Sequence, residues 1–190
     1  MVADFLHIRT ALLAVAIASA CALVLAMAPV ALGARVCASA GATPGEVGKR
    51  TMVRATLCIL NAERVRHGLR TLRADRRLSE AADLHARDMA RRRYFSHVSL
   101  DGSTFVDRIR RTGYLNGARS WTLGENLAWG VGRRSSPRAI LAAWMASDGH
   151  RANILSRSFR DIGIGIAYAA PVPDGGRPAA TFATDFGARG

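Results

Sequence analysis

The C-terminal stretch DIGIGIAYAAPVPDGGRPAATFATDFG, residues 161–187, decides the fold class of this chain. Its first and last segments, DIGIGIAYAA and AATFATDFG, alternate with a period of two residues, which is typical of β-strands. The Pro, Asp and Gly residues of PVPDGGRP between them favour a reverse turn. We therefore expect an antiparallel β-hairpin near the end of the chain.

Helical patterns precede this hairpin. In SSPRAILAAWMAS, residues 135–147, Ser136 stands at a capping position and Pro137 at the first helical position. Further upstream, apolar residues recur every three or four positions from Thr51 to His67, and Gly68 follows as a natural stop. These two segments are predicted to be helices.

Two further helices and one strand are predicted between them. Ser79 is expected to cap a second helix that runs to about Arg92. A short third helix should include Phe105–Ile109 and end at Gly113. The apolar segment SWTLGENLAWGVG, residues 120–132, is bounded by Gly and predicts a buried strand or a tight loop. Helices first and antiparallel strands last indicate an α+β domain.

The N-terminal residues differ from the rest in composition. A weakly basic start leads into an apolar run from about Ala11 to Gly33, which is typical of an export signal. Because the run approaches the roughly 20 residues that span a bilayer, a cleaved signal peptide and an uncleaved membrane anchor both remain open. We predict a leader over residues 1–34, a linker or N-terminal arm over 35–50, and a secreted or membrane-tethered domain over 51–190.

Export places the cysteines in an oxidising compartment, where disulfides form. Cys21 lies within the predicted leader, which leaves Cys37 and Cys58 as a possible disulfide pair. This pairing requires any cleavage to fall near Ala34. Cleavage after Ala40 would instead leave Cys58 without its partner.

The formal net charge of +13 comes almost entirely from arginines that are scattered in short groups. Such a diffuse positive field favours anionic surfaces, including phospholipid headgroups and cell-wall polymers. No zinc-finger spacing, aromatic single-strand-binding motif or basic heptad helix accompanies these arginines. We therefore expect no specific nucleic-acid binding.

Three polar residues stand at breaks in apolar segments that are punctuated by Gly: His97 in FSHVS, Glu125 in LGENLAWG and His150 in DGHRANIL. Two imidazoles and one carboxylate form a ligand set that zinc accepts, with a fourth position left for water. Their spacing alone does not distinguish a metal site from histidines that make structural hydrogen bonds. His85 lies on the apolar stripe of the second helix and is interpreted as a packed histidine.

Five blocks of the sequence resemble successive motifs of the CAP superfamily, whose bacterial members are also called SCP-like extracellular proteins. In chain order the blocks are CILNAERVRHGLRTL, FSHVSLDGSTFVDRI, GENLAWG, WMASDGHRANIL followed by IGIGIAY, and FATDFG. Together they extend over about residues 55–187. The resemblance implies a three-layer α-β-α sandwich in which helices flank a small, mainly antiparallel sheet.

The resemblance also implies a central cleft in which His97, Glu125 and His150 converge and can bind a divalent metal, often zinc. Many eukaryotic members carry a second cleft glutamate, whereas here Asp148 is the only acidic residue between the GEN block and His150. A metal-free His–Glu–His network that holds three segments together is the alternative. No organic cofactor is expected. The residues expected to support the cleft are Asn126, Asp148, Arg151 and Asn153.

Three functions are compatible with these features. The first is a secreted binding module for a lipid or another apolar or cell-envelope ligand, which requires no nucleophile. The second is a zinc-dependent, peptidase-like hydrolase, for which Asp148, Ser96 and Ser99 are the nearby polar residues that could assist catalysis. The third is an envelope protein that docks on anionic polymers. We expect the binding module and leave enzymatic activity open.

Overall fold

The computed structural model describes residues 37–190, which lie within one compact unit. The predicted leader, including Cys21, lies outside the described residues. Within residues 37–190, no helix is both long and apolar enough to cross a membrane.

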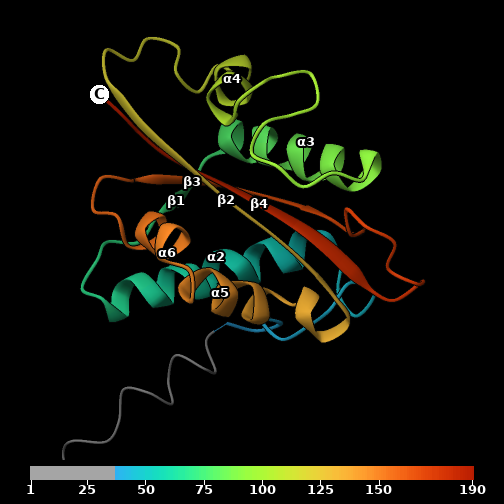
Figure 1. Cartoon of the computed structure of the whole chain (residues 1–190). Helices are drawn as coiled ribbons and strands as arrows, with labels where there is room; N and C mark the ends of the chain where they lie inside the picture. The colour runs from blue at the N-terminus through green and yellow to red at the C-terminus, as the bar shows by residue number, and fades with distance from the viewer. Residues whose placement is uncertain (1–36) are drawn as a thin grey trace, which may run out of the picture. The chain divides into compact units, whose positions relative to one another are not determined.

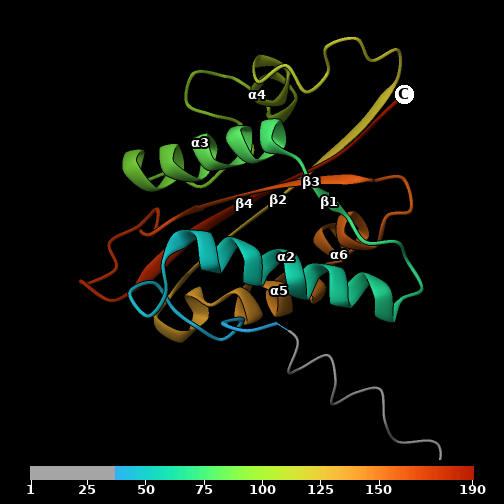
Figure 2. The ribbon, with the colours of Figure 1, turned by 180° about the vertical axis from the view of Figure 1, so that it is seen from behind.

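A four-stranded sheet lies between two layers of helices, as Figure 1 shows and Figure 2 confirms from behind. One face is covered by α2 (Lys49–Arg66), α5 (Pro137–Met145) and α6 (Asp148–Leu155). The other face is covered by α3 (Arg76–Arg92) and α4 (Phe105–Arg111). The short 3₁₀-helix η1 (Gly132–Ser135) precedes α5. The predicted α-β-α sandwich is therefore confirmed.

The strands lie in the order β1-β3-β4-β2. Their bounds are β1 (Arg73–Ala74), β2 (Trp121–Val131), β3 (Asp161–Ala167) and β4 (Ala179–Arg189). The antiparallel pair of β3 and β4 confirms the predicted hairpin, and β2 pairs antiparallel with β4 along all its 11 residues. The two residues of β1, which pair parallel with β3, are too few to form a pattern that predicts a strand.

The alternation of Ile and Gly in β3 does not separate a buried face from an exposed one, because this strand is buried on both faces. Its isoleucines join the large apolar core on the side of α2 and α5. On the other face, a Cβ on Gly163 would lie 2.0 Å from the carbonyl carbon of Leu78, and one on Gly165 would lie 2.2 Å from that of Ala82. Glycine at these positions lets the backbone of α3 lie directly against the sheet.

The predicted start of α3 was wrong. Asp75, not Ser79, caps the helix: its side chain accepts hydrogen bonds from the backbone nitrogens of Arg77 at 2.8 Å and Leu78 at 3.1 Å. Ser79 lies one turn inside, where its hydroxyl donates to the Asp75 carbonyl at 2.8 Å. Asp and Ser are both favourable caps, so residue type alone does not choose between them. The predicted cap of α5, Ser136, is confirmed.

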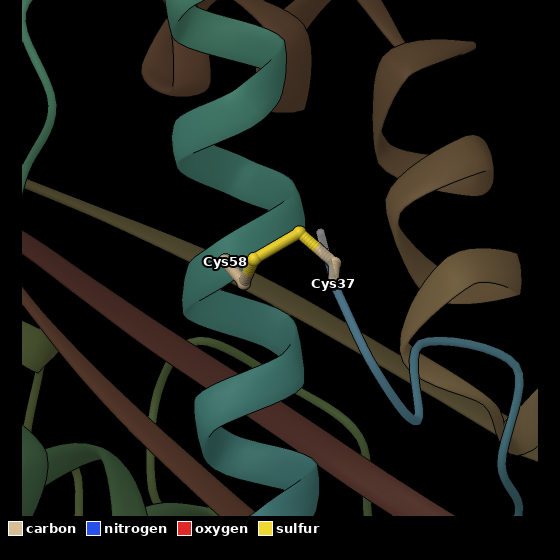
Figure 3. The surroundings of a disulfide bond; sticks show 2 residues. All are labelled: Cys37 and Cys58. Carbon is tan, nitrogen blue, oxygen red and sulfur yellow. A yellow bond between two sulfur atoms is a disulfide. The ribbon is translucent and has the colours of Figure 1, made fainter. Parts of the chain in front are cut away.

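The residues before α2 are attached to the layer that contains α2 and α5. Cys37 forms a disulfide with Cys58 of α2, and their Cα atoms are 5.6 Å apart (Figure 3). The backbone nitrogen of Arg138 also donates a hydrogen bond to the carbonyl of Ala40 at 2.8 Å. The predicted disulfide is therefore confirmed, and it joins the N-terminal arm to the domain.

Replacing both Cys37 and Cys58 by serine should lower the free energy of unfolding by about 3 kcal/mol, because the bridge closes a loop of roughly 20 residues in the unfolded chain. The measurement is denaturant unfolding of the fragment 36–190, followed by circular dichroism. Equal unfolding midpoints for the native and substituted proteins would contradict a stabilising role for the bridge.

Candidate functional site

A buried carboxylate lies at the centre of the polar cluster. Glu125 of β2 has a side chain that is only 1% exposed. Its Oε1 lies 2.7 Å from Nδ1 of His97, in the loop after α3, and its Oε2 accepts a hydrogen bond from Nη2 of Arg108 at 2.7 Å. A carboxylate removed from water requires such partners to remain charged. The Arg108 side chain, from α4, is itself only 8% exposed.

Arg108 also connects α4 with the loop before it. Its Nη1 donates to the Ser99 hydroxyl at 2.9 Å and to the Ser103 carbonyl at 3.1 Å. Its Nη2 donates to the carbonyl of His97 at 3.1 Å, in addition to Glu125. One guanidinium therefore fixes the backbone at His97 and at Ser103, and it pairs with the carboxylate beside His97.

A second acidic residue lies opposite Glu125 on the neighbouring strand. Asp185 of β4 is its direct partner in the register and is fully buried. Burial, followed by the charge of Glu125, raises the pKa of Asp185 well above its ordinary value, so its neutral acid is favoured. No donor among residues 37–190 bonds to either Asp185 oxygen, whereas a proton on Asp185 could be shared with Glu125. The cluster thus places two carboxyl groups beside one guanidinium.

His150 lies in the opposite helical layer. It is the third residue of the eight-residue helix α6. The Asn126 side chain donates to the His150 carbonyl at 3.0 Å, and Nδ2 of Asn153 donates to the Glu125 carbonyl at 3.2 Å and to Oδ1 of Asn126 at 2.9 Å. The two asparagines therefore attach α6 to the edge strand β2.

The His150 imidazole is not hydrogen-bonded to the Glu125 carboxylate. Its Nδ1 is buried and has no partner within residues 37–190. Burial, followed by the charge of His97, lowers the pKa of His150, so the neutral ring is favoured at neutral pH. The structure therefore joins His97 to Glu125 and leaves His150 attached to β2 through its backbone.

Asp148 does not supply a carboxylate to this cluster. Its side chain is 93% exposed and forms an ion pair with Arg151. Arg151 also donates to the carbonyl of Met145 at 3.0 Å, which braces the connection between α5 and α6. Arg151 therefore holds the connection between α5 and α6, whereas Asp148, expected to support the cleft, faces solvent.

The side chains of residues 37–190 do not fit a metal in this arrangement. No three His, Cys, Asp or Glu side chains in that range are grouped closely enough to hold a metal ion. Both oxygens of Glu125 already have partners. The guanidinium of Arg108, whose Nη2 lies 2.7 Å from Oε2 of Glu125, would repel a metal cation bound to this carboxylate. These side chains form a hydrogen-bonded network that includes His97 but not the His150 ring, and zinc binding stays a prediction.

His85 of α3 extends the network beneath the loop after that helix. Its Nε2–H donates to the carbonyl of Ser96 at 2.9 Å, and its Nδ1 lies 3.4 Å from the Ser99 hydroxyl. Burial, followed by the charge of Arg108, lowers the pKa of His85 and favours the neutral ring. This is the packed histidine that the helical stripe predicts, and it helps to fix the loop that carries His97.

A cavity of about 780 Å³ lies along α3 and adjoins this network. Its apolar lining comes from α3, the last residue of β3 and the segment that follows it: Ala81, Leu84, Ala90, Ala167 and Ala169. Its exposed arginines come from α3 and α4: Arg87, Arg91, Arg92 and Arg111. His85, Ser99 and Arg108 also line the cavity, whereas His97, Glu125 and His150 do not. Three acidic residues, Glu80, Asp88 and Asp101, offset part of the positive charge.

Arg108 and Asp185 are the members of the network that sequence analysis does not single out. Each leaves a weak signal, since Arg108 is a charged residue within the short helix FVDRIRR and Asp185 interrupts the apolar alternation of AATFATDFG. A charged residue on an otherwise apolar face is the pattern that could have identified both.

The sequence model of the CAP family, described as the cysteine-rich secretory protein family, matches residues 57–175. The uncharacterized protein YkwD of Bacillus subtilis is 37% identical over 114 residues, which cover 60% of this chain and 42% of YkwD. The uncharacterized membrane protein YlbC of the same organism is 33% identical over 116 residues, which cover 61% of this chain and 32% of YlbC. The chain thus spans less than half the length of these relatives.

Solved structures show the same fold. An extracellular protein containing an SCP domain from Bacillus anthracis superposes with a TM-score of 0.59 and 27% identity, over 74% of this chain and 43% of that one. An outer surface protein from Borrelia burgdorferi superposes with a TM-score of 0.62 over 76% of this chain and 97% of that one, and its 20% identity shows the fold alone. Since the family match covers more than half of the residues and the sandwich is shared, this chain belongs to the CAP family, in the form found in bacterial extracellular proteins.

Proposed function

We propose that this CAP domain is a binding module for a cell-envelope amphiphile that has an acyl chain and an anionic headgroup. The cavity along α3 carries the proposal. Its volume of about 780 Å³ falls within the roughly 300–1,000 Å³ usual for small-molecule sites. A site of this kind needs an apolar wall and a few polar groups, and it needs no nucleophile.

The lining of the cavity matches the two parts of such a ligand. Leu84 and Tyr168, which are 53% and 38% exposed, offer an apolar surface against which methylene groups can pack. Each buried methylene contributes about 0.8 kcal/mol to binding. The exposed guanidiniums of Arg87 and Arg111 can donate charge-assisted hydrogen bonds to a carboxylate or phosphate.

The two other functions have less support. A zinc-dependent hydrolase would need Glu125 as a ligand, and that carboxylate is already bound to His97 and Arg108. Docking on an anionic polymer would use the arginines but would not need the apolar wall of the cavity. Substitution of an apolar residue on that wall therefore separates the amphiphile proposal from polymer docking.

The fragment 36–190 should bind dansyl-undecanoic acid with a rise in dansyl fluorescence, and lysophosphatidylglycerol should displace the probe. Leu84→Glu places a carboxylate on the cavity wall and should weaken binding about tenfold or more, because it removes apolar contact and repels the headgroup. Val65→Glu is the control, since Val65 of α2 is 59% exposed and Leu84 is 53% exposed. No fluorescence change in the native fragment, or equal loss in both variants, would contradict the proposal.

A further inference from the structure

Residues 91–100, which we call the 91–100 surface, present positive and apolar side chains together. Arg91, Arg92 and Arg93 end α3 and are all exposed. Phe95, Val98 and Leu100 follow, with exposed fractions of 46%, 46% and 54%. These are three of the nine large apolar side chains that residues 37–190 leave exposed, and they fall within six consecutive residues. Single exposed apolar residues are ordinary, but such a concentration indicates an interaction site.

The backbone of this surface is held in place by the domain. The carbonyl of Ser96 accepts from His85 at 2.9 Å, and the carbonyl of His97 accepts from Arg108 at 3.1 Å. The backbone nitrogen of Ser99 donates to the Ser103 carbonyl at 2.9 Å. These three hydrogen bonds fix the backbone while the apolar side chains remain exposed, so docking would cost little conformational entropy.

The arginines give the surface a definite charge preference. Nη2 of Arg91 lies 3.4 Å from Oδ1 of Asp88, and Nη1 of Arg92 lies 3.8 Å from its Oδ2. The Asp88 carboxylate therefore offsets part of the charge of these two arginines. No ion pair forms between Arg93 and another residue of the range 37–190. The whole chain carries a formal charge of +13, so the long-range field also attracts anions.

From these observations, we infer that the 91–100 surface docks the domain on an anionic phospholipid bilayer. The arginines would contact phosphate groups, to which a negatively charged membrane surface attracts basic side chains. Phe95, Val98 and Leu100 would enter the boundary between headgroups and acyl chains. An anionic polymer would satisfy only the arginines, and this leaves the apolar side chains unexplained.

Docking does not require the cavity along α3 to be filled, so it stands apart from the proposed function. The two features nevertheless adjoin, because Arg91, Arg92 and Ser99 belong to the 91–100 surface and also line the cavity. Phe95, Val98 and Leu100 do not line it. A domain docked in this way would hold the cavity beside its source of amphiphiles.

The test is sedimentation of the fragment 36–190 with vesicles of equal phosphatidylglycerol and phosphatidylcholine, compared with vesicles of phosphatidylcholine alone. The fragment is used because the apolar run before residue 34 would itself enter bilayers. It contains the compact unit and its disulfide. The apolar variant is Phe95→Ser/Val98→Ser/Leu100→Ser. Its control is Val65→Ser/Val172→Ser, two exposed apolar residues of other segments.

A second pair of variants tests the charge. Arg91→Gln/Arg92→Gln/Arg93→Gln removes three charges from the surface, and Arg50→Gln/Arg54→Gln/Arg66→Gln removes three exposed charges from α2 in the other layer. Circular dichroism and thermal unfolding check that each variant is folded. Dansyl-undecanoic acid binding should be unchanged in the apolar variant, which separates failure of docking from failure of the cavity.

We expect binding to the phosphatidylglycerol vesicles that falls about tenfold or more in both surface variants and about twofold or less in both controls. Binding to phosphatidylcholine alone should be weaker, and 0.5 M salt should weaken binding to the anionic vesicles. Failure of the native fragment to sediment with anionic vesicles would overturn the inference. Binding that the arginine variant loses and the apolar variant keeps would also overturn it, since that result describes electrostatic adsorption without insertion.

Discussion

Gly163→Ala should lower the free energy of unfolding by about 3 kcal/mol or more, at the upper end of the usual cost of overpacking a core. The added Cβ would lie 2.0 Å from the carbonyl carbon of Leu78 and 2.2 Å from the backbone nitrogen of Ser79. Backbone atoms cannot rotate away as a side chain can, so α3 as a whole must move from the sheet. Gly165→Ala should act in the same way, because its Cβ would meet the backbone of Ala82.

The control for this prediction is Gly149→Ala in α6, where an added Cβ has nothing within 4 Å. Alanine favours the helix over glycine, so this variant should be as stable as the native protein or slightly more stable. The measurement compares the denaturant midpoints of the native protein, Gly163→Ala and Gly149→Ala. A Gly163→Ala protein as stable as the Gly149→Ala protein would contradict the close contact of α3 with β3, on which the position of the cavity depends.

Arg108→Met should lower the free energy of unfolding by about 3–5 kcal/mol, the usual cost of leaving one partner of a buried ion pair without the other. The Glu125 side chain, only 1% exposed, would lose the cation that lies 2.7 Å away. The loop that carries His97 would also lose its hydrogen bonds to the guanidinium. The substitution therefore removes charge compensation and loop attachment together.

Arg110→Met provides a matched control on the same helix, because Arg110 is 59% exposed and its one ion pair within residues 37–190 is with Asp107, three residues earlier. Its cost should be about 0.5 kcal/mol or less. The double variant Arg108→Met/Glu125→Leu should recover part of the stability lost in Arg108→Met, because it removes the uncompensated carboxylate. If Arg108→Met and Arg110→Met had equal midpoints, the buried pair would not stabilise the site as described.

Periodicity and turn chemistry were sufficient to predict most of the fold. The hairpin of β3 and β4, the cap of α5 and the short α4 each have a local signal of the expected kind. The cap of α3 was misplaced because Asp75 and Ser79 are both suitable caps one turn apart. The alternation of Gly and Ile in β3 predicts a strand, whereas glycine is required at Gly163 and Gly165 by the close backbone of α3, a tertiary contact that no local pattern contains.

The candidate site was predictable only in part. The resemblance brought together His97 and Glu125, which the structure joins, but it did not identify Arg108 as their partner. Asp185 became visible only through the register of β2 with β4, which places it opposite Glu125. The cavity has no sequence signal of its own, because its lining comes from α3, from α4 and the loop before it, and from the end of β3 and the residues that follow, which are distant in the chain.

The central claim is that the cavity along α3 binds an anionic amphiphile, and a nuclear magnetic resonance titration tests it most directly. The ¹⁵N-labelled fragment 36–190 would be titrated with lysophosphatidylglycerol below its micelle concentration. We predict saturable amide shifts centred on Leu84, Arg91 and Ala169, which line the cavity, with the amides of α2 unchanged. Shifts that are absent, or that are confined to α2 and α5, would contradict the claim.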